Sequence, residues 1–499
     1  MKFLPAVVLA TMLALSGAGD AQNLPTLGDT AREDLSPIME RKLGEQIMQS
    51  VRRDPDYMDD GPVSEYLNKL GNLMLEKRPD ARGETGNDFE FFAVRDPVLN
   101  AFAFPGGFIG FHSGLILAAQ TESELASVMG HEIGHVAQRH IARMIGSQKF
   151  DVLIPLASLL LGALAARSSP DAAMAVIMGG QGVAIQRQIN FTREAEREAD
   201  RVGFQILRDG GFDTAGMVTF FGRMQGASRN YTDVAPSYLR SHPLTSERMA
   251  DIQGRMMDQR YKQRVDGLDF YLMQARVRVL QDSSTQGLTD AATFFAGQEH
   301  SEKTESKLSA EYGLAFVAYI QHDYAKAQKL LNQVVKQVEQ SVRQKNMLKQ
   351  TSAFASLAID ISMGNKQLDL AIKQAETAMQ QLPLSRGIAY QYAEALIAAN
   401  RSAEAGLFLR DQISLYRQEA GLQNLLAKSY EAQGKQALQH IALAEAYALD
   451  GALPAALQQL DIARRDPDVQ YFDLSVIDAR EREWKEKRRE EMLDEKKKK

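Results

Sequence analysis

Cysteine is absent from all 499 residues of the chain. Disulfide bonds, thiolate metal sites and cysteine nucleophiles are therefore excluded, and any metal ion must be held by histidine, aspartate or glutamate. A basic surplus is also missing, because the formal net charge at pH 7 is -6. This charge disfavours a nucleic-acid binder, which would present a basic face. The length predicts two or more domains, and the 44% hydrophobic content suits a globular chain.

Long apolar runs are few, and the first lies near the start of the sequence. Lys2 precedes an apolar stretch over 3–15, and small residues follow over 16–21. This order is typical of a secretory signal peptide (1–21), with cleavage expected after Ala21 or, as second choice, after Ala18. The alternative, a membrane anchor, is disfavoured because spanning helices need roughly 20 apolar residues. We therefore expect an exported protein, and the missing cysteine excludes a lipoprotein anchor.

Apolar spacing predicts the local structure of the first half. Two amphipathic helices are expected within 35–80, and a strand over 89–94. Alternating aromatic residues over 100–117, around a Pro-Gly-Gly turn, predict a hairpin or a kinked strand pair. Thr121 is the expected N-cap of the next helix, with Glu124 at the capping-box position.

That next helix contains His131-Glu132-Ile133-Gly134-His135. Side chains four residues apart share a helix face, so the two imidazoles can bind one zinc ion. Glu132 lies one residue further round and can reach a water on that ion. Zinc lowers the pKa of such a water to about 7, and a carboxylate can take its proton as it attacks an amide. The alternative interpretation is two core or surface histidines on an apolar helix.

A catalytic zinc ion also needs a third protein ligand. Glu196 and Asp200 are four residues apart and share a face of a later acidic helix. Glu196 could complete a His-His-Glu site, and Asp200 could accept a hydrogen bond from a ligand histidine and fix its tautomer. A solvated acidic helix face is the alternative. His112 and His140 are treated as structural, because their spacing does not fit this site.

Residues 150–192 are unusually rich in apolar and small side chains. The strongly apolar part, 153–166, is short of a membrane span and is bracketed by Asp151 and Arg167. We predict a buried or mobile helical lid over the site. A segment that touches the membrane is the alternative.

The pattern changes to helix-turn-helix units from about residue 300. Units are expected to begin near Leu308, Ser352, Arg386 and Ala420, and the last three starts are 34 residues apart, the tetratricopeptide period. After residue 435 the phase is open, because a unit starting near Ala437 also fits. An ordinary helical domain is the alternative. The predicted organisation is a domain over 22–265, a helical linker and repeats over 266–470, and a charged tail over 471–499.

The two motifs, His-Glu-Ile-Gly-His and Glu-Arg-Glu-Ala-Asp, resemble those of the HtpX-like metallopeptidase family, which includes the CAAX prenyl proteases. The resemblance spans about 35–255. It implies a zincin-like peptidase domain that binds one zinc ion through His131, His135 and Glu196. It further implies that Glu132 is the catalytic base and that Asp200 supports the ligands. The expected fold is mainly α-helical with a small β-sheet, followed by the repeat solenoid.

The exported form with C-terminal repeats resembles the members of this family that support β-barrel assembly in the periplasm. That resemblance implies unfolded or misassembled outer-membrane proteins as substrates and the barrel-assembly machinery as a partner of the repeats. It also implies that 150–192 plugs the site, that His242 is a resting-state fourth zinc ligand, and that the strand at 100–104 binds extended substrates. A repeat-based scaffold or chaperone with latent proteolysis is the alternative function. An integral membrane protease is disfavoured by the length and composition of 150–185.

Overall fold

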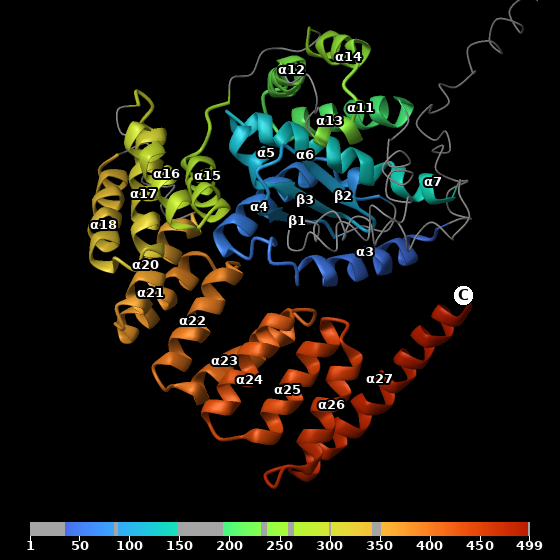
Figure 1. Ribbon diagram of the computed structural model, residues 1–499, viewed down its shortest axis with the longest axis vertical. Helices are drawn as coiled ribbons and strands as arrows, with labels where there is room; N and C mark the ends of the chain where they lie inside the picture. The colour runs from blue at the N-terminus through green and yellow to red at the C-terminus, as the bar shows by residue number, and fades with distance from the viewer. Residues whose placement is uncertain are drawn as a thin grey trace, which may run out of the picture.

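The computed structural model describes residues 35–83, 88–146, 193–230, 237–257, 264–298, 301–341 and 351–497. The expected signal peptide and the predicted lid over 150–192 lie outside these residues. The described chain forms an N-terminal region (35–257) and a helical arm (264–497), which curves beneath the N-terminal region in Figure 1.

The N-terminal region combines one small sheet with helices on its flanks. Its elements are α3 (Pro37–Val51), α4 (Gly61–Lys77), η1 (Pro79–Arg82), β1 (Glu90–Val94), β2 (Ala101–Phe104), β3 (Phe108–His112), α5 (Ser113–Ala118), α6 (Glu122–Ala137), α7 (His140–Gly146), α11 (Arg193–Asp209), α12 (Ala215–Asn230), α13 (Ser237–Ser241) and α14 (Ser246–Met257). The two helices expected within 35–80 and the strand expected at 89–94 are confirmed.

The sheet has the strand order β1-β3-β2. β2 and β3 form the expected antiparallel hairpin, whose turn uses Gly106 and Gly107 at φ +80° and +94°. β3 also pairs in parallel with β1. The prediction of extended structure up to residue 117 is wrong, because helix α5 begins at Ser113. Because the strand order is β1-β3-β2, β2 lies at an edge of the described sheet.

Helices α6 and α11 approach each other backbone to backbone. A Cβ atom added at Gly203 would lie 2.8 Å from the backbone of Gly130, and one added at Gly134 would lie 2.8 Å from the carbonyl oxygen of Ala199. Only glycine permits this separation. The close approach brings the two predicted motifs onto facing surfaces.

The predicted start of α6 is confirmed in part. The Thr121 side chain accepts a hydrogen bond from the backbone N–H of Glu124 at 3.2 Å, as an N-cap residue should. Glu124 does not complete a capping box on Thr121. Its carboxylate instead accepts from the backbone N–H of Gln120 and is paired with Arg223. The cation and the hydrogen bond from the Gln120 backbone offset the cost of burying this carboxylate.

The helical arm is a series of antiparallel helix pairs. Its helices are α15 (Leu268–Gln281), α16 (Thr285–Gln298), α17 (Thr304–Ile320), α18 (Tyr324–Gln340), α20 (Ser352–Gly364), α21 (Leu368–Gln381), α22 (Arg386–Ala398), α23 (Ser402–Leu415), α24 (Ala420–Ala432), α25 (Gln436–Leu449), α26 (Leu453–Arg465) and α27 (Tyr471–Lys497). Helices begin at Ser352, Arg386 and Ala420, as the 34-residue spacing predicts. The assignment of these units as tetratricopeptide repeats stays a prediction.

The last helix continues the arm rather than standing free of it. Ile477 and Trp484 of α27 are buried in a cluster with Leu453 and Leu460 of α26. The charged residues that follow over 485–490 are exposed. Within the described residues, no helix combines the length and apolar character needed to cross a membrane.

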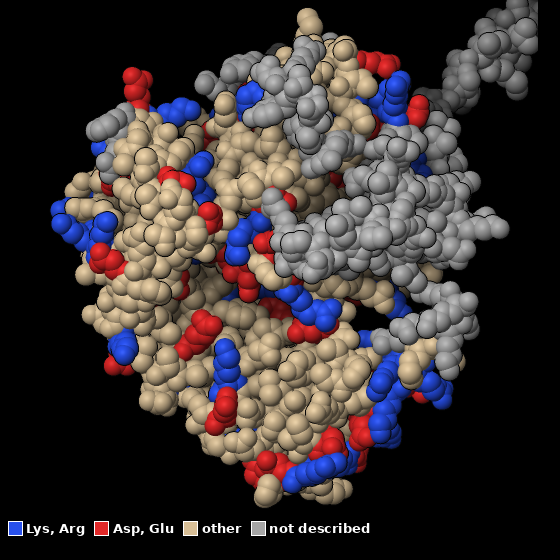
Figure 2. Space-filling model, in the orientation of Figure 1, with Lys and Arg blue, Asp and Glu red and all other residues tan. Residues whose placement is uncertain are grey.

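A buried ion pair and a partly buried group of hydrogen bonds join the arm to the N-terminal region. Arg276 of α15 pairs with Asp60 at the start of α4 and donates to the Tyr312 hydroxyl at 2.7 Å. Further along, Glu65 of α4 accepts hydrogen bonds from the Ser385 hydroxyl and the Gly387 N–H. Figure 2 shows a hollow between the two parts, bordered by acidic and basic side chains.

Candidate active site

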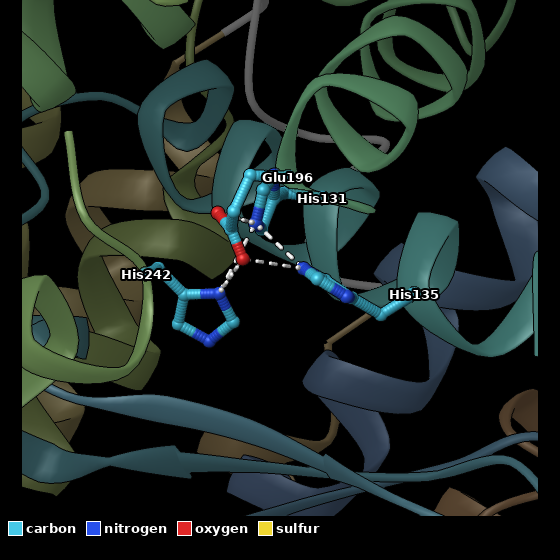
Figure 3. Close-up of side chains that lie close together, drawn as sticks. All are labelled: His131, His135, Glu196 and His242. Atoms are coloured by element: carbon cyan, nitrogen blue, oxygen red, sulfur yellow. Dashed lines mark hydrogen bonds and ion pairs between the residues drawn. The ribbon is translucent and has the colours of Figure 1, made fainter. Parts of the chain in front are cut away.

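Helix α6 presents His131 and His135 toward the same point. Both side chains are fully buried, and their Nε2 atoms are 3.0 Å apart. Glu196 of α11 faces them, with carboxylate oxygens 3.5 Å from His131 Nε2 and 3.4 Å from His135 Nε2. Figure 3 shows the two rings and the carboxylate converging, with His242 beside them. Helical spacing in the sequence paired His131 with His135, and Glu196 was the candidate third ligand that the family resemblance implied.

His242 lies in the segment between α13 and α14. Its Nδ1 atom is 2.9 Å from Glu196 and 3.5 Å from His131 Nε2, and its ring stacks on Tyr238 with centroids 4.7 Å apart. One potential ligand atom from each of His131, His135, Glu196 and His242 can be chosen so that all four lie within 4.8 Å of one another.

This arrangement fits a divalent metal ion. Three imidazole nitrogens and one carboxylate oxygen form a donor set that zinc commonly uses. The Asp200 carboxylate lies 3.0 Å from Nδ1 of His131, so a neutral His131 keeps its proton there and turns the lone pair of Nε2 toward the Glu196 carboxylate, 3.5 Å away, where two acceptors face each other. A cation between them resolves that conflict.

Glu132 extends from the same helix without joining the four converging side chains. It is 1% exposed, and its Oε1 atom has no hydrogen-bond partner among the described residues. This Oε1 atom lies 3.7 Å from Nε2 of His242. A buried carboxylate oxygen without a partner is costly, so its position beside the cluster suits a group that handles a proton during chemistry.

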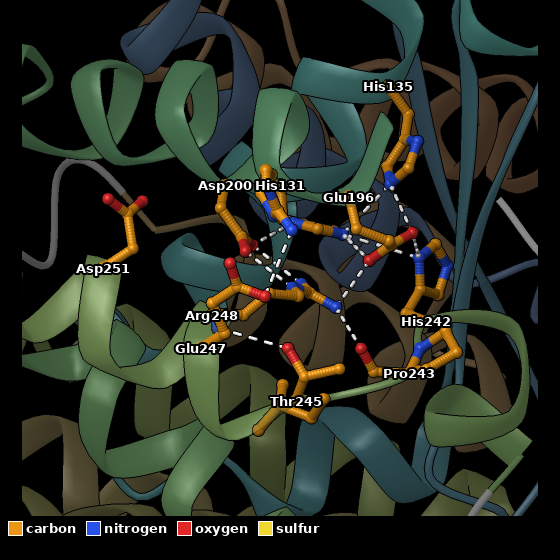
Figure 4. Close-up of polar contacts among 12 residues, drawn as sticks. His131, His135, Glu196, Asp200, His242, Pro243, Thr245, Glu247, Arg248 and Asp251 are labelled. Carbon is orange, nitrogen blue, oxygen red and sulfur yellow. Dashed lines mark hydrogen bonds and ion pairs between the residues drawn. The ribbon is translucent and has the colours of Figure 1, made fainter. Parts of the chain in front are cut away.

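Asp200 lies behind His131, on the side away from the cluster. Its Oδ1 atom is 3.0 Å from His131 Nδ1, which places it where the sequence interpretation expected it. Arg248 of α14 holds Asp200 from the other side with two hydrogen bonds, of 2.7 and 2.8 Å. The same guanidinium is 2.7 Å from Glu196 and donates to the Pro243 carbonyl at 2.9 Å, as Figure 4 shows.

Sequence reasoning missed Arg248. Once Glu196 and Asp200 are both buried, charge balance requires a cation between them, and that requirement is the only signal the sequence offers. The chain has 58 lysines and arginines, and no local pattern distinguishes this one. Arg248 reaches the two carboxylates because α14 packs against α11.

His140 was interpreted as structural because its spacing does not fit the site, yet it lies against the cluster. Its Nδ1 atom is 2.9 Å from Nδ1 of His135, so it contacts the outer side of a cluster histidine. His140 also pairs with Glu198. His112, by contrast, pairs with Asp96 on the sheet and is not among the four converging residues.

The electrostatics of the cluster follow from burial and the pairing described above. Burial alone would lower the pKa of His131, but its contacts with Asp200 and Glu196 raise it to about 9. Burial holds the pKa of His135 well below its usual value. Burial opposes ionisation of Glu196 and Asp200, yet His242 and the cluster histidines lower the pKa of Glu196, and Arg248 and His131 lower that of Asp200. Both carboxylates are therefore charged at neutral pH.

Comparison with known proteins agrees with this geometry. Residues 66–256 match Peptidase family M48. The chain is 30% identical to the beta-barrel assembly-enhancing protease of Escherichia coli K12 over 483 residues, which covers 96% of this chain and 95% of that protein.

The chain belongs to peptidase family M48.

Two further relatives support the assignment. The beta-barrel assembly-enhancing protease of Yersinia pestis is 29% identical over 92% of this chain and 90% of its own length. The metalloprotease LoiP of Escherichia coli K12 is 27% identical over 51% of this chain and 95% of its own length. The protein is therefore a metalloendopeptidase of family M48 with a helical C-terminal region, and the buried cluster lies within the matched residues.

Proposed function

We propose that this chain is a zinc-dependent endopeptidase of the periplasm that assists the assembly of outer-membrane β-barrel proteins and degrades those that misassemble. The observation that carries the proposal is the convergence of His131, His135 and Glu196 beside Glu132, whose Oε1 atom has no hydrogen-bond partner among the described residues. The names of the full-length relatives support the role in barrel assembly. Export is supported by the signal-like pattern over 1–21.

In this proposal His131, His135 and Glu196 hold one zinc ion. When bound, the ion supplies a Lewis acid that polarises an amide carbonyl and makes water more acidic. Glu132 takes the proton of the attacking water and later delivers it to the leaving amine. Asp200, whose Oδ1 atom lies 3.0 Å from Nδ1 of His131, would keep the proton on Nδ1 and so leave Nε2 free for the ion.

His242 provides the resting state. Its Nδ1 atom already lies within the cluster, where it would occupy the position that substrate and water need. Its release would open the site, so we expect His242→Ala to raise basal proteolysis. Unchanged or lower activity would count against this role.

Extended substrates bind along β2. This strand is an edge of the described sheet, and α6 packs against it. An edge strand can add a further strand through backbone hydrogen bonds, which recognises many sequences and suits unfolded barrel segments. The helical arm would dock substrates or the barrel-assembly machinery.

The test measures metal content by mass spectrometry together with cleavage of an unfolded outer-membrane barrel protein. We expect about one zinc per wild-type chain and none in Glu196→Ala or His131→Ala. Glu132→Gln should keep zinc and lose cleavage by at least about 10²–10⁴-fold, because general-base catalysis contributes that much. Glu194→Ala, an exposed glutamate on the same helix, is the matched control.

Each result discriminates between the candidate functions. Full zinc occupancy in Glu196→Ala would break the ligand assignment, and cleavage by clean Glu132→Gln would remove the base. Zinc-free wild type would instead favour the repeat-based scaffold. A zinc-loaded enzyme that cleaves peptides but leaves barrel proteins untouched would retain the peptidase and remove the proposed substrate.

A further inference from the structure

The two histidines of α6 differ in what supports them from behind. His131 is backed by a carboxylate, Asp200, at 3.0 Å. His135 is backed by another imidazole, since its Nδ1 atom is 2.9 Å from Nδ1 of His140. In known metal sites the outer ring nitrogen of a ligand histidine usually donates to a carboxylate, a carbonyl or a water, and this contact fixes the ring.

His140 is itself held in a defined pairing. Its Nε2 atom is 3.0 Å from a carboxylate oxygen of Glu198, and Arg143 donates to the same oxygen at 2.7 Å. His140 is 3% exposed, and the Glu198 side chain is partly exposed. A buried imidazole is therefore connected to a solvent-facing ion pair on one side and to His135 on the other.

The positions of the protons in this series of contacts follow from its two ends, the metal cluster and Glu198. The Nε2 atom of His135 faces the cluster, so a metal ion there requires its proton to be on Nδ1. That proton must be donated to Nδ1 of His140, which then has to act as an acceptor. A neutral His140 consequently carries its own proton on Nε2, where Glu198 accepts it. One set of tautomers satisfies the three contacts that lead from the cluster through His135 and His140 to Glu198.

The backbone is shaped to make this contact. On a continuous helix, residues five apart point about 140° away from each other, so His140 would face away from His135. Instead α6 ends and Arg139 adopts φ +52°, a left-handed conformation unusual for a residue with a side chain. Arg139 is held there by hydrogen bonds to Glu40 of α3 and to the carbonyl of Leu35. The turn directs His140 back onto His135.

We propose that His140 and Glu198 form a positioning relay that fixes the tautomer and orientation of His135 toward the metal ion. This inference rests on the proposed metal site and adds two residues to it. His140 acts through His135, and the relay matches, on the second ligand, the support that Asp200 and Arg248 give to His131.

The experiment determines the zinc dissociation constant of the full chain by competition with a chromogenic chelator, and records the visible spectrum of the cobalt-substituted protein. We expect His140→Phe to weaken zinc binding by roughly 10–100-fold and to alter the cobalt spectrum. His140→Gln should stay within about threefold of wild type, because its amide oxygen accepts and its NH₂ group donates. Glu198→Ala should weaken binding by up to about tenfold.

Two controls match these changes. His112→Phe removes another buried histidine that pairs with an aspartate away from the cluster, and Glu194→Ala removes an exposed glutamate from the helix that carries Glu198. Both should bind zinc as wild type does. Folding of each variant is checked by circular dichroism.

A folded His140→Phe that binds zinc with wild-type affinity would overturn the relay, and so would a folded His140→Gln that loses as much affinity as His140→Phe. If His140→Phe does not fold, the other variants decide the question. Glu198→Ala indistinguishable from Glu194→Ala would then overturn the proposal. Wild type that binds no zinc would refute the proposed function itself, whereas zinc-binding wild type with unaffected variants removes the relay alone.

Discussion

The N-terminal region and the helical arm bury different kinds of side chain. The interior of the N-terminal region holds many ionisable groups: Glu40, Asp60, His112, Glu122, Glu124, His131, Glu132, His135, His140, Glu196, Asp200, His242 and Arg248. Among the described residues of the arm, the buried polar side chains are serines and threonines, with Arg276 at the junction as the exception, and Asp360 is partly buried. The arm's core is otherwise largely alanine and leucine.

This difference shows how each part is stabilised. Ionisable groups in a low-dielectric interior are tolerated only when each has a partner, so removing one member leaves an uncompensated charge. The arm is stabilised by contacts between neighbouring helices, and a change there acts on its neighbours first. The stability of the N-terminal region therefore depends on complete networks of paired charges, whereas the stability of the arm depends on packing between neighbouring helices.

The largest expected effect tests the charge network. Arg248→Met removes the cation shared by Asp200 and Glu196, and we expect it to destabilise the N-terminal region by about 3–5 kcal/mol, because two buried carboxylates lose their partner. Zinc should restore part of this loss by supplying positive charge. Urea unfolding with and without zinc measures both effects.

Arg255→Met is the matched control for Arg248→Met. Arg255 lies on the same helix and pairs with Asp251 on the surface, so its loss should change stability by less than about 0.5 kcal/mol. Equal effects of the two substitutions would remove the distinction between buried and surface charge on which the comparison rests.

The second prediction concerns the arm. Leu396→Ala empties a fully buried position of α22 and should cost about 2–5 kcal/mol locally, while zinc affinity stays at the wild-type value. The chain has one tryptophan, Trp484, which is buried in the last helices, so its fluorescence reports on the end of the arm. The exposed Leu407 provides the control, Leu407→Ala. Loss of zinc binding in Leu396→Ala would show that the two parts unfold together.

The third prediction concerns the backbone contact between α6 and α11. Gly203→Ala places a Cβ atom 2.8 Å from Gly130 and should cost about 1–3 kcal/mol and weaken zinc binding, because the ligand-bearing helices must separate. Gly222→Ala on α12 meets no atom within 4 Å and should stabilise by up to about 1 kcal/mol. Thermal unfolding and zinc titration of both variants test the opposite signs. The same sign for both would contradict the close-approach explanation.

The smallest effect is a pH dependence within the arm. Burial raises the pKa of Asp360 to about 6, although Arg276 and the hydrogen bond from Gln391 oppose the shift, while Asp60 and Glu394 add to it. The folded state therefore keeps this proton between about pH 4 and pH 6, where the unfolded chain has lost it. The group favours folding most at low pH, and its contribution falls by on the order of 1–2 kcal/mol as pH rises through that window.

Asp360→Asn should remove this dependence. Urea unfolding of metal-free wild type and Asp360→Asn, at several pH values from 4.5 to 7.5, provides the measurement. The stability of the variant relative to wild type should increase up to about pH 6 and remain level above it. A difference independent of pH would contradict the assignment.

Local patterns anticipated much of this molecule. Helical periodicity gave the pairing of His131 with His135 and of Glu196 with Asp200, and the 34-residue spacing gave the starts of α20, α22 and α24. Each of these features depends on residues close together in sequence, where helix geometry dictates which side chains meet.

The features that were missed depend on the chain changing direction. Extended structure was expected beyond His112, where α5 begins, because alternating aromatics do not show where a strand ends. His140 was set aside because its spacing assumes a continuous helix, which the turn at Arg139 interrupts. Arg248 joins its carboxylates across 48 residues in one case and 52 in the other. Local spacing cannot encode contacts of that range.

The junction between the two parts also affects the order of folding. The side chain of Gln49 on α3 donates to the carbonyl of Leu449, a contact that joins residues 400 positions apart. Contacts of such range form late, because the intervening chain must first be ordered. During synthesis from the N-terminus, the charged core around the site can fold before α25 has been synthesised. The surface of α3 around Gln49 is then exposed to solvent until α25 has been added and Leu449 contacts it.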